Sequence, residues 1–244
     1  MDGAVGAQPV LVEKGADPRV LVIGFTGFKG GLMMPTFDFF KQTQLTACSR
    51  VLLLDTSRSC YLAGVPPTLP DFATLLAFLR EAIVKLAPEK VMCIGASSGA
   101  YGALLLGHAL KADYVHAFSP FTYLSRAVAE QLGDTEGLQR HGEAADRIAQ
   151  LPKAVQPLVD LQPVLARGNG KTRFYVHVCK NSTFDLMRAK RLEQTPGATI
   201  IAYPCASHGV ALALANAGLL EEVLKIENQD RVEEIIRERN ASVS

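Results

Sequence analysis

Hydrophobic residues in this chain are grouped into short, nearly continuous runs, and longer stretches with helical spacing separate the runs. Several runs are rich in Val, Ile and Leu, which is typical of strands that are buried on both faces of a parallel sheet. The predicted strands cover residues 19–24, 51–55, 90–95, 113–119, 172–179 and 198–203. Residues 9–14 are expected to form an antiparallel strand at the edge of the sheet, after a loose leader through Gln8.

The stretches between these strands predict helices. Residues 70–87 place apolar side chains at helical spacing and stop before Pro88, which cannot continue a helix. Further helices are expected at residues 185–192 and 207–224, and a charged, amphipathic surface helix is expected at residues 229–239. Strands and helices that alternate along one chain predict the α/β class, here a mostly parallel, doubly wound sheet with helices on both faces.

One long segment interrupts this alternation, at residues 120–171. It contains helical patterns at 123–132 and 142–151, followed by several prolines and a Gly-Asn-Gly turn at 168–170. About fifty residues are more than a crossover helix needs, and long insertions of this kind tend to be lids or binding loops. We therefore expect a single domain over residues 1–244 with a small helical lid at 120–171; a single crossover helix with long loops is the alternative.

Composition and charge exclude some classes of partner. The chain has 244 residues, of which 48% are hydrophobic, and a net charge of +1. A balanced charge gives no electrostatic basis for binding nucleic acid or an anionic membrane. No apolar run reaches the roughly 20 residues of a membrane-spanning helix. We expect neither nucleic-acid binding nor membrane insertion, and no metal or organic cofactor, because metal-ligand clusters and nucleotide-binding glycine motifs are absent from the sequence.

The cysteines favour a reducing compartment. There are five of them, an odd number, and none forms a Cys-x-x-Cys pair. Several lie inside apolar runs, and the N-terminus lacks the pattern of a signal peptide. The sequence therefore predicts buried, reduced thiols in a cytoplasmic protein.

A nucleophile motif follows the predicted strand at residues 90–95. Residues 91–99 read Val-Met-Cys-Ile-Gly-Ala-Ser-Ser-Gly, so an apolar strand runs directly into Gly-x-Ser-x-Gly, and a helix rich in Ala and Leu follows. A sharp turn between strand and helix lifts the hydroxyl of Ser97 clear of the sheet. Gly95 and Gly99 leave room for the crowded backbone around it because they lack a Cβ. In this context the motif predicts that Ser97 is a nucleophile.

A serine nucleophile needs a general base and an acid that orients the base, and both belong at the carboxyl ends of parallel strands. His208 follows the strand at 198–203, and Asp185 follows the strand at 172–179. The remaining histidines lie within predicted strands or helices, or in the insertion, and are expected to be packed or solvent-facing: His108, His116, His141 and His177. Three other carboxylates fit the acid position less well, namely Asp55, Asp113 and Asp160.

An acyl-transfer site also needs two N–H donors for the oxyanion. The residue after the nucleophile, Ser98, supplies one at the start of its helix. The second is expected from the glycine-rich loop Phe25-Thr-Gly-Phe-Lys-Gly-Gly31, with Phe28 as the first choice and Thr26 as the alternative. In the same loop Lys29, together with Arg58 after the next strand, is expected to contact an anionic part of the substrate, or else to be solvated. Thr26 and Phe121 are also expected to contact substrate.

The chain order Ser97, Asp185, His208 resembles that of the α/β-hydrolase family, and the likeness extends from Arg19 to Leu224. It implies that Ser97 attacks an ester, thioester or amide carbonyl, that His208 transfers the proton and that Asp185 orients His208. The oxyanion loop of this family often begins His-Gly-x, whereas Thr26 stands in the first position here.

Three functions remain open at this stage. The first is a hydrolase of a carboxylic ester or thioester with an acyl-enzyme intermediate. The second is an acyltransferase with the same triad, and the third is a non-catalytic binding module that kept the fold. The sequence cannot separate the first two, because water and other acceptors use one arrangement of residues. A small acyl compound is the expected partner, and the sequence makes no prediction about oligomeric state.

Overall fold

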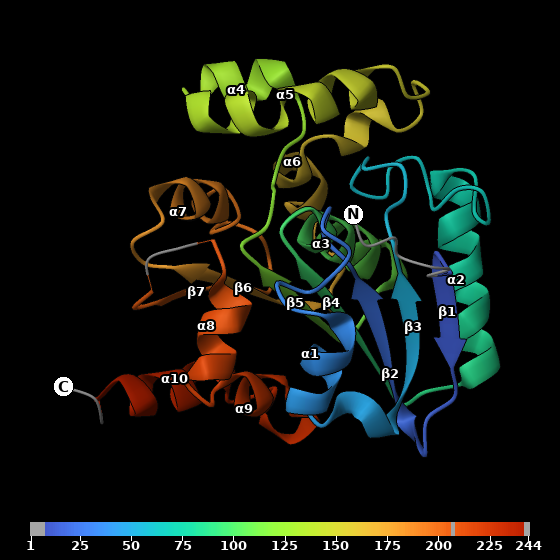
Figure 1. The fold of residues 1–244 in the computed structure, drawn as a ribbon, viewed down its shortest axis with the longest axis vertical. Coiled ribbons are helices and arrows are strands. Elements are labelled where there is room, and N and C mark those ends of the chain that lie inside the picture. The colour runs from blue at the N-terminus through green and yellow to red at the C-terminus, as the bar shows by residue number, and fades with distance from the viewer. Residues whose placement is uncertain (1–7, 206–207, 242–244) are drawn as a thin grey trace, which may run out of the picture.

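A twisted, seven-stranded sheet forms the centre of the computed structural model, which describes residues 8–205 and 208–241 (Figure 1). The strand order is β1-β3-β2-β4-β5-β6-β7. β1 pairs antiparallel with β3, and the other strand pairs described are parallel. The strands are β1 (Val10–Glu13), β2 (Asp17–Phe25), β3 (Cys48–Leu53), β4 (Lys90–Ala96), β5 (Tyr114–Phe118), β6 (Arg173–Cys179) and β7 (Ala198–Tyr203). The predicted strands and the α/β class are confirmed.

Helices cover both faces of the sheet, and each face has its own core (Figure 1). Successive residues of a strand point to opposite faces, so Leu21, Ile23 and Phe25 of β2 pack on one side while Val20 and Val22 pack on the other. The first side is covered by α2 (Phe72–Leu86), α3 (Ser98–Leu110), α6 (Leu161–Leu165) and α7 (Thr183–Lys190). The second is covered by α1 (Thr36–Gln42), α8 (Val210–Asn216), α9 (Leu220–Leu224) and α10 (Val232–Ala241).

The helices correct the sequence predictions in two places. The single helix expected at 207–224 is two helices, α8 and α9, because the chain turns at Gly218, whose φ of 67° is in the left-handed region. Helix α1 was not predicted, since it has only seven residues and follows a proline. Three short 3₁₀ helices complete the described elements: η1 (Leu45–Ala47), η2 (Gln156–Leu158) and η3 (Ile226–Asn228). None of the described helices is both long and apolar enough to cross a membrane.

The insertion at 120–171 is largely helical. It contains α4 (Arg126–Gln131), α5 (Thr135–Ala149), η2 and α6. Helices α4 and α5 pack on each other and lie beyond the carboxyl ends of the strands, at the top of Figure 1, whereas α6 packs against α3. The alternative prediction of a single crossover helix is therefore wrong. That the segment acts as a lid stays a prediction.

The cysteine prediction is wrong for two of the five thiols. Cys179, at the end of β6, forms a disulfide with Cys205, which follows β7, and the two Cα atoms are 4.8 Å apart. The sheet brings them together because Cys179 pairs with Tyr203 across β6 and β7, and Cys205 lies just beyond that pair. Cys48, Cys60 and Cys93 are free and buried. Disulfides persist in oxidising compartments, so the argument from reduced thiols for a cytoplasmic protein no longer holds.

Two histidines lie fully buried in the middle of the sheet. His116 Nδ1 is 3.0 Å from His177 Nε2, and His116 Nε2 is 2.7 Å from Gln229 Oε1. His177 Nδ1 is in turn 2.8 Å from the hydroxyl of Tyr203. Burial lowers the pKa of His116 to about 4 and that of His177 well below the usual value. Both imidazoles are therefore neutral and structural, as expected for histidines within strands.

Candidate active site

Ser97 stands at the tight turn between β4 and α3. Its φ of 55° lies in a region that residues with a side chain rarely adopt, and strain of this kind is concentrated at functional sites. The two glycines of the motif make the turn possible. A Cβ on Gly99 would lie 2.1 Å from the carbonyl oxygen of Phe25, and one on Gly95 would lie 2.3 Å from that of Gly99. Close packing of strand, turn and helix therefore requires glycine at both positions.

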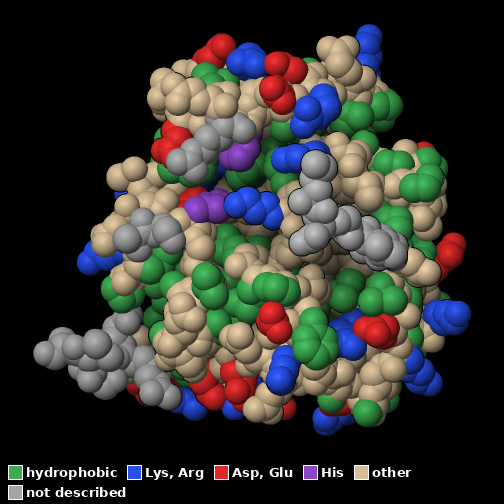
Figure 2. Space-filling view, viewed as in Figure 1, with side chains coloured by type: hydrophobic (Ala, Val, Ile, Leu, Met, Phe, Trp, Pro, Cys, Tyr) green, Lys and Arg blue, Asp and Glu red, His purple; other side chains and the backbone are tan. Residues whose placement is uncertain are grey.

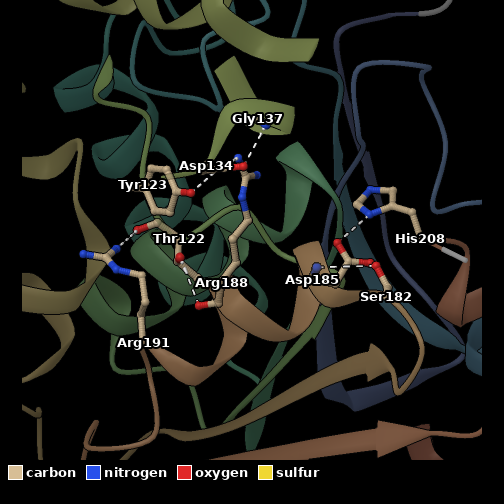
Figure 3. A network of polar contacts seen from close by, with 9 residues as sticks. All are labelled: Thr122, Tyr123, Asp134, Gly137, Ser182, Asp185, Arg188, Arg191 and His208. Atoms are coloured by element: carbon tan, nitrogen blue, oxygen red, sulfur yellow. Dashed lines mark hydrogen bonds and ion pairs between the residues drawn. The ribbon is translucent and has the colours of Figure 1, made fainter. Parts of the chain in front are cut away.

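His208 and Asp185 lie in line with Ser97. His208 Nε2 is 2.9 Å from Ser97 Oγ, and His208 Nδ1 is 2.8 Å from Asp185 Oδ1. Figure 3 shows the imidazole of His208 pointing at Asp185, which sits near the start of α7. The Asp185 side chain is fully buried, whereas that of His208 is 37% exposed. Asp185 is thus shielded from water, while His208 is open to the cavity.

Hydrogen bonds and a disulfide link the segments that follow β6 and β7, which lead to Asp185 and His208. Beyond the ends of β6 and β7, the backbone N–H of Lys180 donates to Tyr203 and that of Asn181 donates to Cys205. The Cys179–Cys205 disulfide lies between them, three residues before His208. These bonds join the chain just beyond the ends of β6 and β7, close in sequence to Asp185 and His208.

Three carboxylates considered as alternatives to Asp185 have other partners. Asp55 is buried, which raises its pKa, and accepts a hydrogen bond from the hydroxyl of Ser57. Asp113 accepts the backbone N–H of Val91 at the opposite end of the sheet. Asp160 begins α6 and pairs with an arginine of the segment after α7. None of the polar contacts that these three carboxylates make among the described residues is with His208.

The predicted oxyanion donors are close to Ser97, but one of them is engaged. Ser98 is the first residue of α3, and its backbone N–H has no acceptor among the described residues. The backbone N–H of Phe28 donates to Ser98 Oγ at 3.0 Å. Thr26, the alternative donor, directs its backbone N–H to Leu53 and is therefore occupied within the sheet. The backbone N–H of Phe28 is therefore hydrogen-bonded to Ser98 and is not free to bind an oxyanion in this structure.

Ser97 and His208 line a cavity of about 890 Å³. Of the residues expected to contact substrate, Lys29 and Arg58 line it. Thr26 is buried and does not line it, and Phe121 lines a smaller adjoining cavity instead. The cavity also has lining residues that sequence reasoning did not assign to it, namely Met33, Met34, His141 and Phe184. His141 comes from α5, and no local pattern indicates that α5 lies over the site.

The smaller cavity, of about 30 Å³, lies between the insertion and α7 and shares Phe28 and His141 with the larger one. Arg188 lines it and is 97% buried, with its guanidinium over the ring of Phe121 at 4.6 Å. Its Nη2 also pairs with Asp134, the N-cap of α5, at 3.1 Å (Figure 3). Helix α7 therefore carries Asp185 and, through Arg188, also contacts the insertion.

Known structures share this architecture. No family model matches the chain, and no curated protein matches it in sequence. Among solved structures, an alpha/beta hydrolase enzyme from the metagenome of sediments from the lagoon of Mar Chica, Morocco, has 17% identity and a TM-score of 0.53. That match covers 98% of this chain and 100% of the other. An S-formylglutathione hydrolase from Agrobacterium tumefaciens has 13% identity and a TM-score of 0.55, over 86% of this chain and 92% of that one.

A third solved structure, esterase B from Lactobacillus rhamnosis, has 14% identity and a TM-score of 0.54, over 96% of this chain and 88% of the other. Similarity at this level of identity concerns the fold. The chain has the α/β-hydrolase fold, as the order of its motifs led us to expect.

Proposed function

We propose that this protein is a serine hydrolase that cleaves a carboxylic ester or thioester, with Ser97 as nucleophile, His208 as general base and Asp185 as the acid that orients the base. The observation that carries the proposal is the pair of contacts at His208, 2.9 Å to Ser97 Oγ and 2.8 Å to Asp185 Oδ1. This geometry lies beside a cavity large enough for a small acyl compound.

The proposed reaction has two halves. His208 Nε2 takes the proton of Ser97 while Oγ attacks the carbonyl carbon, and the negative charge on the oxygen is stabilised by the N–H of Ser98. The protonated His208 then gives its proton to the leaving alcohol or thiol, and an acyl-enzyme forms. In the second half His208 takes a proton from water as the water oxygen attacks the acyl carbon. The bond between the acyl carbon and Ser97 Oγ then breaks, His208 returns the proton to Oγ, and the carboxylic acid is released. Asp185 stabilises the imidazolium in both halves.

Water access favours hydrolysis over acyl transfer. The side chain of His208 is 37% exposed, and the cavity is open to solvent. An acyltransferase needs to keep water away from its acyl-enzyme. No feature of the described residues provides such a dry acceptor site, so the hydrolase is the function proposed. The complete triad also makes a non-catalytic binding module the weaker alternative.

The proposal is tested with a fluorophosphonate probe, which reacts with activated serines. We expect labelling of the wild type and none of Ser97→Ala or His208→Ala, with circular dichroism showing that all three proteins are folded. Peptide mapping of the adduct distinguishes Ser97 from the adjacent Ser98. A folded wild type that stays unlabelled and hydrolyses neither p-nitrophenyl esters nor acyl thioesters overturns the proposal.

A further inference from the structure

The Lys and Arg side chains that line the large cavity bring positive charge to it. Lys29 and Arg58 line it, together with His141 and His208, and within the described part of the chain no Asp or Glu does so. Figure 2 shows lysine or arginine side chains beside histidines on this face, beneath the region formed by α4 and α5. A cleft lined by one sign of charge concentrates ligands of the opposite sign.

Arg58 stands in a loop that is held in a strained conformation. Arg58, Cys60 and Tyr61 have φ values of 52°, 55° and 70°, a region that is costly for residues other than glycine. The buried carboxylate of Asp55 holds the loop, since it accepts the hydroxyl of Ser57 at 2.8 Å. The fold therefore maintains a costly backbone at the position that presents Arg58 to the cavity.

The side chain of Arg58 is also oriented. Its guanidinium lies over the ring of Phe28, 5.1 Å from the centroid. Phe28 belongs to the loop whose backbone N–H reaches Ser98, next to the nucleophile. The planar guanidinium group carries five N–H donors, which suit it to bind a carboxylate or a phosphate. Arg58 is thus connected through Phe28 to Ser98, the residue next to the proposed nucleophile.

Arg58 and Lys29 differ from two nearby arginines, which pair with acidic side chains. Arg188 pairs with Asp134 at 3.1 Å and Arg191 pairs with Asp160 at 2.9 Å. Among the residues that the structure describes, neither Arg58 nor Lys29 forms an ion pair, although both line the cavity. Two cations in one cavity that lack an acidic partner among the described residues can bind an external anion.

We propose that the substrate is an anionic ester or thioester, and that Arg58, assisted by Lys29, binds a carboxylate or phosphate located away from the scissile carbonyl. This inference rests on the hydrolase function proposed for Ser97 and adds a substrate class to it. Arg58 binds the anion through its N–H edge, and Lys29 adds a second positive charge from the oxyanion loop. The bound anion fixes the substrate over Phe28 with its ester carbonyl beside Ser97.

Matched esters test the proposal on both sides of the ester bond. On the acyl side, p-nitrophenyl pentanoate is compared with the p-nitrophenyl monoester of glutarate. On the alcohol side, 4-methylphenyl acetate is compared with 4-carboxyphenyl acetate and with the acetate of 4-hydroxyphenyl phosphate. Each is assayed with wild type, Arg58→Gln, Arg58→Lys and Lys29→Gln. The ratio of variant to wild type cancels the differences in leaving-group acidity among the esters.

We expect Arg58→Gln to lower kcat/KM for at least one anionic ester roughly 10- to 100-fold, mainly through KM, because a charge-assisted contact is lost. The neutral ester of the same pair should change by less than about threefold, a factor within the ordinary effect of a surface substitution. Arg58→Lys should recover part of the loss, and Lys29→Gln should give a smaller one. The anionic ester that responds identifies the side of the bond and the kind of anion.

Lys85→Gln is the matched control, since Lys85 is an exposed cation in the last turn of α2 and does not line the cavity. It should leave the preference between charged and neutral esters unchanged. A wild type that does not prefer any anionic ester, or an Arg58→Gln protein that loses activity equally on both members of each pair, overturns the anion site while leaving the hydrolase intact.

Failure of the hydrolase proposal is recognised separately, because binding can be measured without turnover. Isothermal titration of the Ser97→Ala protein with monomethyl glutarate, and with methyl pentanoate as the neutral counterpart, reports the anion site alone. We expect binding of the monoester and its loss in the Ser97→Ala, Arg58→Gln double variant. Absence of binding to Ser97→Ala by this monoester and by the anionic esters above rejects the anion site, whatever the outcome of the fluorophosphonate labelling.

Discussion

The two sides of the site are built in different ways. On the acid–base side, Asp185 and His208 follow β6 and β7, which are neighbours in the sheet and are joined beyond their ends by backbone hydrogen bonds and by the Cys179–Cys205 disulfide. On the oxyanion side, the loops after β2 and β3 carry residues in strained backbone conformations. There the amide of Phe28 is held by the hydroxyl of Ser98.

The two sides therefore suit different tasks, one a fixed distance between acid and base and the other donors that change partner during the reaction. A base and its acid need a constant distance through both halves of the reaction, and two cross-linked strand ends provide it. An oxyanion pocket needs its donors only when the tetrahedral intermediate forms. A donor that rests on a neighbouring hydroxyl stays satisfied until then, because an unpaired buried N–H is costly.

The largest effect is expected at the acid. Asp185→Asn removes the charge that stabilises the imidazolium and the acceptor that fixes the tautomer of His208, so kcat should fall by roughly 10³- to 10⁴-fold. The fall is measured with a p-nitrophenyl ester at saturating substrate. Asp38→Asn, at an exposed position of α1, is the control and should retain wild-type activity.

The competing assignment of the acid is tested by Asp55→Asn. Because Asp55 holds the loop of Arg58 by accepting hydrogen bonds from Ser57 and Tyr61, its substitution should affect KM for anionic esters more than kcat for neutral ones. If Asp55→Asn lost most of its kcat on neutral esters while Asp185→Asn stayed active, Asp55 would be the catalytic acid. The assignment of Asp185 would then be wrong.

The next effect concerns the cross-link on the acid–base side. The disulfide closes a loop with a sequence separation of 26 residues, and the entropy lost by the unfolded chain predicts a stabilisation of about 3.5 kcal/mol. Cys205→Ala should lower the free energy of unfolding in urea by that amount. Dithiothreitol should destabilise the wild type similarly and leave Cys205→Ala unaffected. If the reductant changes neither protein, the spacing of the two loops depends on the backbone alone.

A somewhat smaller effect is expected from the histidines in β5 and β6. His116 is neutral in the folded protein with a pKa of about 4, whereas in the unfolded chain it takes a proton near 6.5. The unfolded state therefore binds more protons between these values, and stability falls as pH decreases from about 6.5 to about 4, by about 3 kcal/mol for this group. Burial lowers the pKa of His177 as well and adds in the same direction.

Urea denaturation of wild type and His116→Gln across this pH range measures the effect. The variant removes one titrating imidazole, so its stability should depend less steeply on pH than that of the wild type, whatever its absolute stability. Equal slopes would show that other groups cause the pH dependence. Because β6 carries the loop of Asp185, acid conditions should weaken the acid–base side by unfolding the strand beneath it.

The same comparison explains how much the sequence could predict. Runs of Val, Ile and Leu located the strands, and the rule that functional residues follow parallel strands selected Asp185 and His208, because both signals are local. The disulfide was missed because it depends on β6 and β7 being neighbours in a particular register. His141 was missed because α5 is brought over the cavity by contacts between distant segments, among them the ion pair of Arg188 with Asp134.

The smallest effect is expected on the oxyanion side, at Ser98. Its hydroxyl accepts the amide of Phe28 and thereby fixes the loop after β2 beside the nucleophile. Ser98→Ala removes that acceptor but keeps the backbone N–H at the start of α3, so kcat should fall about 10-fold, less than the loss of a complete oxyanion donor, with KM nearly unchanged. Ser98→Thr, which retains a hydroxyl, should recover part of the loss. A kcat that rises in Ser98→Ala would mean that the hydroxyl competes with the oxyanion for the amide of Phe28, and that this side of the site is held closed until substrate binds.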